Sequence, residues 1–169
     1  ETETGSYPNY EGLSFDPDHQ GKMSWTSKQI FEELESILHE TGYPDIVLFS
    51  SPGGNDILNG LPYENVIENI NGIIDLFQDH NPDIVILIEQ LAPGKTSFMT
   101  PELTAIFDQA VLDVETIAQE QTDENSQVIP VNMFEGFIDR YLADDIHYNA
   151  EGAEFIAQRY YEVLETFLE

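Results

Sequence analysis

The residues best suited to chemistry in this sequence are an acid and an imidazole in Asp144-Asp145-Ile146-His147-Tyr148-Asn149, just ahead of the last expected helix. Asp144 stands three residues before His147, in a loop that Asn149 is expected to end as a helix N-cap. The carboxylate could hold the imidazole in one tautomer, which leaves the other ring nitrogen to accept a proton from a nucleophile. The alternative is a helix-capping loop in a very acidic chain, where an Asp near a His is expected by chance.

A second motif, Gly53-Gly54-Asn55-Asp56, follows an apolar run at residues 45–50 that is typical of a strand buried on both faces. Asp144 and His147 lie in the connection after another expected strand. Because ligands bind outside the carboxyl ends of the strands in open parallel sheets, we expect both motifs to meet there. For Asn55 the alternative is a purely structural role in a tight turn, since Gly-Asn is a common tight-turn sequence. Asp56 is expected to stabilise the turn and to take no part in the chemistry.

Strands and helices are expected to alternate along the chain. Thr26 and Gln29 form a possible capping box for a helix that ends near Gly42, and Thr100-Pro101 has the residues preferred at a helix start. A further helix is expected from residue 66 to residue 77, and further strands at residues 83–88 and 128–131. This order predicts an α/β fold with a parallel sheet and helices on both faces.

Composition limits the classes of function. The 169 residues fit one domain, with an irregular lead-in at residues 1–24. The formal net charge of -28, with five Lys and Arg, excludes nucleic acid and anionic membranes as partners. The acids are dispersed, so we expect no metal site and no cofactor. Solubility in high salt, divalent-cation binding or a secreted protein's acidic surface could each explain the charge, and we expect an extracellular location.

Together, the glycine-rich Asn-Asp turn and the Asp-x-x-His motif resemble those of the SGNH (GDSL-type) hydrolases, in particular their carbohydrate-esterase-like branch. The segment Phe15–Thr26 and the strand entries at Pro44-Asp45 and Pro82-Asp83 are similar to that branch. The resemblance implies a flavodoxin-like three-layer α/β/α fold. It also implies roles for individual residues: His147 as general base, Asp144 as its orienting carboxylate, Asn55 and the backbone N–H near Ser24 as oxyanion donors, and Gly21, Gly53, Gly54 and Asp56 as motif or structural residues. The family usually has Gly where this chain has Ser24.

The family's nucleophile is missing from the sequence. The family carries its Ser in a Gly-Asp-Ser turn after the first strand, and residues 1–169 contain no such turn. Ser24, Ser50 and Ser51 are the nearest substitutes, without precedent in the family. The first strand–helix–strand unit is missing with the Ser, which leaves an apolar edge beside residues 45–50 unpaired.

Three interpretations stay open: an amino-terminally shortened piece of a longer enzyme, a second polypeptide that supplies the missing strands and the Ser, or a fold that has lost its nucleophile. We therefore expect an ester hydrolase that uses Ser-His-Asp acyl transfer, with an acylated carbohydrate or a small ester as substrate. The alternative is a catalytically inactive binding or assembly subunit that uses its exposed sheet edge. Cation-dependent binding is a third and weaker hypothesis.

Overall fold

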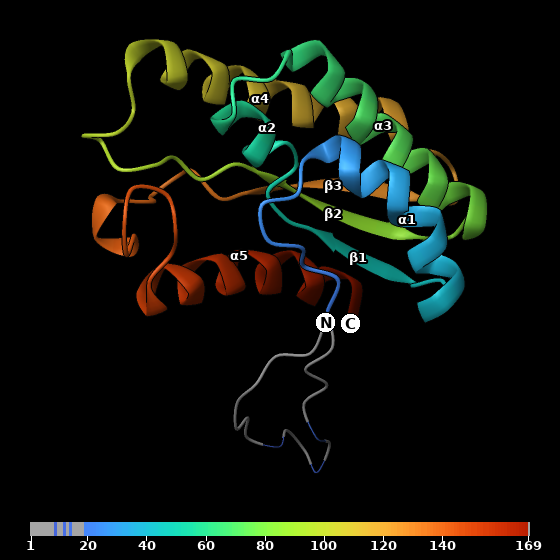
Figure 1. Cartoon of the computed structure of the whole chain (residues 1–169). Helices are drawn as coiled ribbons and strands as arrows, with labels where there is room; N and C mark the ends of the chain where they lie inside the picture. Colours follow the sequence, from blue (N-terminus) through green and yellow to red (C-terminus); the bar gives the residue numbers. More distant parts are fainter. Residues whose placement is uncertain (1–8, 10–11, 13, 15–18, 169) are drawn as a thin grey trace.

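The computed structural model of the chain describes residues 9, 12, 14 and 19–168, with side chains up to residue 166. Most of the expected lead-in, including Phe15–Asp18, therefore lies outside the described residues. The described elements, shown in Figure 1, are α1 (Ser27–Thr41), β1 (Ile46–Phe49), α2 (Gly54–Leu58), α3 (Tyr63–His80), β2 (Val85–Gln90), α4 (Pro101–Gln121), β3 (Gln127–Asn132), the short 3-10 helix η1 (Asp139–Tyr141) and α5 (Ala150–Leu168).

The three described strands form one parallel sheet in the order β1-β2-β3, with Ile46 opposite Val85 and Val85 opposite Gln127. α1, α3 and α4 lie on one side of the sheet and α5 lies on the other (Figure 1). The larger core joins these three helices to the sheet around Ile74, Ile84 and Ile86, which are almost fully buried. Strands alternating with helices therefore give the expected three-layer α/β/α fold.

The helix starts follow the local signals. The Thr26 side chain accepts the Gln29 backbone N–H and the Gln29 side chain accepts the Thr26 backbone N–H, which completes the expected capping box of α1. Thr100 caps α4, with Pro101 in its first turn. The Asn149 side-chain oxygen accepts the Gly152 N–H at 3.0 Å at the start of α5. Each of these caps satisfies helix N–H groups that have no partner inside the helix.

Two expectations need correction. The second strand runs over Val85–Gln90 and not over residues 83–88, so that Glu89 and Gln90 are buried at its carboxyl end. The glycine-rich turn after β1 continues into the short helix α2, which the sequence did not predict. Both differences bring backbone and polar groups to the carboxyl edge of the sheet.

The outer edge of β1 has no strand beside it within the described part of the chain. Ile46 and Leu48 of this strand remain 37% and 49% exposed, which is unusual for apolar residues of a parallel sheet. Within the described residues, β1 therefore presents an open edge where the sequence predicts a missing strand–helix–strand unit. Separately, no helix among the described residues is long and apolar enough to cross a membrane.

Candidate active site

His147 and Asp144 are in direct contact. The His147 Nδ1 atom lies 2.8 Å from Asp144 Oδ2 and 3.1 Å from Oδ1. Both side chains are largely exposed, with 75% of the His147 side chain and 58% of the Asp144 side chain accessible. If Nδ1 carries the proton toward Asp144, Nε2 is the basic nitrogen of the ring. The pair therefore has the arrangement of a general base and the carboxylate that orients it.

Asp144 is fixed by the backbone as well as by His147. Its Oδ1 accepts the Ile146 N–H at 3.0 Å and the His147 N–H at 2.8 Å. First these backbone donors, and then the His147 side chain, hold the pKa of the Asp144 carboxyl well below its ordinary value. The carboxylate is thus both ionised and oriented before any substrate arrives.

The loop that carries this pair is closed at its base. Leu142 and Tyr148 form an antiparallel bridge, and the Ala143 N–H donates to the His147 carbonyl at 2.8 Å. The Asn149 N–H donates to the Tyr141 carbonyl at 2.9 Å. A Cβ at Gly152 would lie 2.1 Å from that same carbonyl oxygen, so only glycine permits the close approach.

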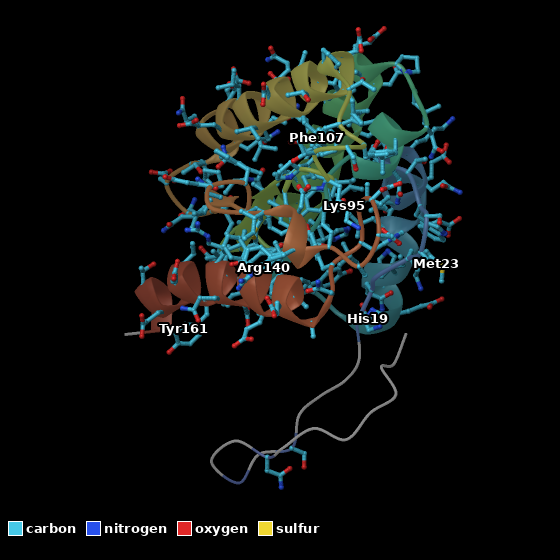
Figure 2. All side chains as sticks on the ribbon, turned by 90° about the vertical axis from the view of Figure 1, so that its left-hand side faces the viewer. His19, Met23, Lys95, Phe107, Arg140 and Tyr161 are labelled. Carbon is cyan, nitrogen blue, oxygen red and sulfur yellow. The ribbon has the colours of Figure 1, made fainter. Side chains whose placement is uncertain are left out.

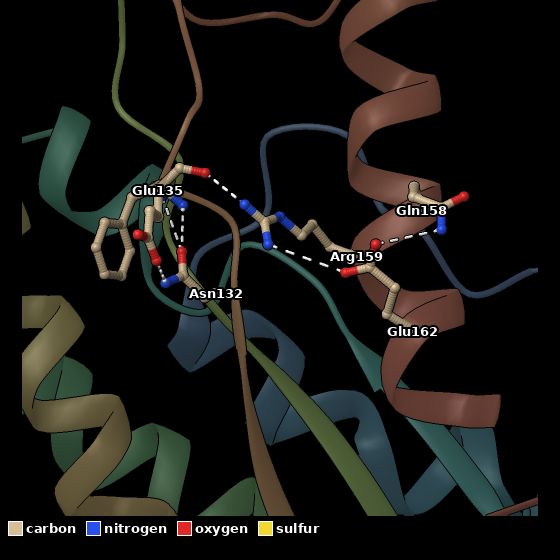
Figure 3. Close-up of polar contacts among 6 residues, drawn as sticks. Asn132, Glu135, Gln158, Arg159 and Glu162 are labelled. Carbon is tan, nitrogen blue, oxygen red and sulfur yellow. Dashed lines mark hydrogen bonds and ion pairs between the residues drawn. The ribbon is translucent and has the colours of Figure 1, made fainter. Parts of the chain in front are cut away.

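A second anchor joins the segment after β3 to α5 (Figure 3). The Arg159 guanidinium donates to the Glu135 carbonyl and lies 3.9 Å from the Glu162 carboxylate. The Asn132 side-chain oxygen accepts the N–H groups of Phe134 and Glu135. These contacts fix the chain's path from β3 toward residues 142–149, the histidine loop, which carries Asp144 and His147.

Asn55 lies in the first turn of α2. Its Nδ2 donates to the Trp25 carbonyl at 2.8 Å, which joins the turn after β1 to the segment before α1. Gly53 precedes α2 with a φ of 72°, and a Cβ there would lie 2.2 Å from Val66 Cγ1. Gly53 is therefore required by both conformation and packing. Asn55 Nδ2 carries two hydrogens, so one remains for another acceptor.

Ser24 adopts a conformation that usually belongs to glycine. It has a φ of 62° in the turn that the Trp25 N–H closes on the Lys22 carbonyl at 3.3 Å. Glycine adopts this left-handed conformation most readily, and Ser24 adopts it here. Gly21 lies in the same segment, where its N–H donates to His19 Nδ1 at 3.0 Å.

Asp56 connects its turn to the start of α1. It is 3% exposed and accepts the Ser27 N–H at 2.8 Å and the Ser27 hydroxyl at 2.9 Å. A carboxylate at the first turn of α1 is also favoured by the helix dipole. Asp56 therefore fixes α1 against the turn that presents Asn55.

The structure adds a polar group that the sequence did not reveal. Glu89 is 3% exposed at the end of the central strand, and its Oε2 accepts the Ser51 N–H at 2.6 Å. Burial raises the pKa of the Glu89 carboxyl, although the Ser51 N–H opposes this shift. Burial and the Glu89 charge also raise the pKa values of Tyr148 and Tyr160. The buried Tyr160 hydroxyl lies near Glu89 but outside hydrogen-bonding geometry in the described structure.

Loops after all three strands thus gather at one edge of the sheet. Ser51 follows β1 and contacts Glu89 of β2, while the Lys95 N–H after β2 donates to the Asp145 carbonyl after β3 at 2.8 Å. Figure 2 views this edge, with Lys95 and Arg140 near the centre of the view and Met23 to one side. Asn55 belongs to the same edge but shares no hydrogen bond with His147 in the described structure. Across residues 19–166, no three His, Asp or Glu side chains gather as a metal site.

The fold and this edge define an α/β/α protein with a His–Asp pair at the carboxyl edge of a parallel sheet. Residues 7–155 match the model of the GDSL-like lipase/acylhydrolase family, and the chain belongs to that family. No curated protein sequence matches the chain closely enough to count as a relative.

Solved structures share the fold. One is a mutant acetyl esterase with an acetate ion, at 23% identity and a TM-score of 0.78, with 94% of this chain and 77% of that chain covered. A family 3 carbohydrate esterase from Talaromyces cellulolyticus has 22% identity and a TM-score of 0.77, with 94% of this chain and 77% of that chain covered. The Clostridium thermocellum family 3 carbohydrate esterase has 24% identity and a TM-score of 0.70, with 87% of this chain and 68% of that chain covered.

Proposed function

We propose that this chain provides the base and the oxyanion donors of an SGNH-type ester hydrolase, and that the nucleophilic Ser lies outside residues 1–169. The observation that carries the proposal is the His147–Asp144 contact of 2.8 Å at the sheet edge that also presents Asn55. Membership of the GDSL-like lipase/acylhydrolase family supports ester hydrolysis as the reaction. An acetylated carbohydrate is the proposed substrate, because the fold is shared with an acetyl esterase and two carbohydrate esterases.

In this proposal the reaction is acyl transfer in two halves. The Ser hydroxyl oxygen attacks the ester carbonyl carbon while its proton moves to His147 Nε2. The oxyanion accepts hydrogen bonds from the Asn55 amide and from the backbone N–H near Ser24. The C–O bond to the sugar then breaks, and the sugar oxygen takes the proton from Nε2. Water then gives a proton to the same nitrogen and attacks the acyl carbon; the bond from that carbon to the Ser oxygen breaks, acetate leaves, and the Ser oxygen takes the proton back from Nε2.

The experiment measures hydrolysis of p-nitrophenyl acetate by two proteins: residues 1–169, and the same residues extended at the amino end by an apolar strand that ends in Gly-Asp-Ser. We expect turnover only from the extended protein, and its loss in His147→Ala. Asn55→Ala should lower kcat by about 100-fold to 1000-fold, because one oxyanion donor is lost. Its melting temperature should change little, because only the bond to the Trp25 carbonyl is removed.

Two outcomes would contradict the proposal. Hydrolysis by residues 1–169 that depends on His147 would put the nucleophile inside them, and Ser50→Ala and Ser51→Ala would then identify it. A folded, extended protein without turnover would favour the second candidate, an inactive binding or assembly subunit. The open edge of β1 is the observation that favours this second candidate. Secretion is part of either proposal, and the acidic composition is its only support.

A further inference from the structure

Glu89 places a carboxyl group where a buried strand normally has an apolar side chain. It follows Val85 and Leu87 on the face of β2 that packs against α5, and it is 3% exposed. Removing a carboxylate from water costs stability unless hydrogen bonds compensate for the lost solvent. Proteins that break a packing rule in this way often do so at functional sites. Glu89 lies at the carboxyl end of the central described strand, which is the end that carries the candidate active site.

The Glu89 carboxylate holds the turn after β1 from below. Its Oε2 atom lies 2.6 Å from the Ser51 nitrogen, which is shorter than the usual range of about 2.7–3.2 Å for such bonds. Short bonds of this kind are typical of a charged acceptor. On the α5 side its neighbours are aromatic, since burial and then the Glu89 charge raise the pKa values of Tyr148 and Tyr160. Little water can therefore compete with Ser51 for the carboxylate, which strengthens the bond.

Ser51 has a backbone conformation that needs support from its surroundings. Its φ of 48° lies in the left-handed region, which residues other than glycine rarely adopt. Strained backbone of this kind persists only where neighbouring contacts determine it. The Ser51 carbonyl accepts the Gly54 N–H at 3.2 Å, and the Ser51 hydroxyl leaves no room for a Cβ at Gly54. Ser51 is therefore packed directly against the residue that begins α2.

Asn55, the oxyanion donor of the proposed function, is the second residue of α2. Its side chain donates to the Trp25 carbonyl at 2.8 Å, and its backbone follows from the turn that Ser51 begins. An oxyanion donor is effective only within about 2.7–3.1 Å of the place where the oxyanion forms. A small displacement of the Ser51 turn would therefore lower the rate without unfolding the chain.

We propose that Glu89 is a positioning residue for Asn55, on which it acts through the Ser51 N–H. The inference rests on the proposed function for the role of Asn55. If Glu89 only stabilised the fold, any side chain that restores stability would serve equally well. If it positions Asn55, an acceptor for the Ser51 N–H is required at this place.

The first test uses nuclear magnetic resonance on residues 1–169. Glu89→Gln keeps an oxygen acceptor for the Ser51 N–H, whereas Glu89→Leu has none. We expect the Ser51 amide to exchange with deuterated water about tenfold faster in Glu89→Gln and about 100-fold faster in Glu89→Leu than in the original chain. The side-chain amide signals of Asn55 should shift in Glu89→Leu and keep their positions in Glu89→Gln.

The second test measures p-nitrophenyl acetate hydrolysis by the extended protein described above. Glu89→Leu should lower kcat by about tenfold to 100-fold and leave KM within about threefold, because a contact of the transition state is displaced. Glu89→Gln should keep kcat within about threefold of the original value. Val85→Ala is the control on the same strand and face, and it should lower the melting temperature while kcat and the Asn55 signals stay unchanged.

Unchanged Asn55 signals in a folded Glu89→Leu protein would overturn the positioning role. So would a kcat that falls equally in Glu89→Leu and Val85→Ala, because stability alone would then explain the loss. If Glu89→Leu does not fold, the original chain and Glu89→Gln decide: an unprotected Ser51 amide in the former, or shifted Asn55 signals in the latter, would also overturn it. The expected signals without turnover by the extended original protein would count against the proposed function and leave the link from Glu89 to Asn55 in place.

Discussion

The low pKa of Asp144 depends more on backbone N–H groups than on the His147 side chain. Two N–H groups, from Ile146 and His147, bond to its Oδ1, while the imidazole lies against Oδ2. The backbone donors come first among the causes of its low pKa. The carboxylate therefore remains a fixed anion whether or not His147 is protonated. This constancy suits a residue whose role is to orient the imidazole.

Because the folded pKa of Asp144 lies below the value of about 3.9 in an unfolded chain, its ionised form adds stability above about pH 4. That stability is lost as the pH falls through the folded pKa. Carbon-13 NMR should find the Asp144 carboxyl still ionised at about pH 3 in the folded protein. In His147→Ala the pKa should stay depressed, because both backbone bonds remain. Titration at the unfolded value in either protein would contradict this account, and the urea-unfolded chain provides the reference.

At the scale of elements, the close contact between α5 and the histidine loop explains a glycine. Gly152 is buried in the first turn of α5, against the carbonyl of Tyr141. Gly152→Ala should displace that carbonyl, weaken its bond with the Asn149 N–H, and cost about 1–3 kcal/mol. For a chain of this size each kcal/mol lowers the melting temperature by about 2–4 °C. Ala153→Ser, exposed in the same turn, is the control and should change little. Equal melting temperatures for the two variants would show that the contact is not tight.

The elements also show which features a sequence can predict. The capping residues Thr26 and Thr100 act within a few residues of themselves, so their helices were predicted correctly. Asp144 and His147 are close in sequence, and their contact was predictable for the same reason. The burial of Glu89 was not predictable, because it depends on packing against Ser51 of another loop and Tyr160 of a distant helix. α2 was missed because five residues that begin with glycine carry little helical signal.

For the whole molecule, the dominant feature is a net charge of -28 on 169 residues. The charge is spread over exposed helix surfaces, including Glu115 and Glu120 toward the carboxyl end of α4. Glu120, in the last turn of α4, also opposes the helix dipole. Repulsion of this kind destabilises the compact state and weakens as salt screens it. We therefore propose that the chain is adapted to high salt.

The melting temperature should rise steeply between about 0.01 M and 0.1 M sodium chloride, where the screening length falls from about 30 Å to 10 Å. Restricting the comparison to dilute salt matters, because concentrated salts also strengthen apolar burial. The double variant Glu115→Gln and Glu120→Gln should melt higher than the original chain in dilute buffer, and its melting temperature should depend less on salt. A matched pair of changes at Gln109 and Gln119, each to Asn, keeps the charge and should leave the salt dependence unaltered. If the original chain melts at the same temperature across this range, its acidity is not a source of repulsion in the folded state, and adaptation to salt would have to be abandoned.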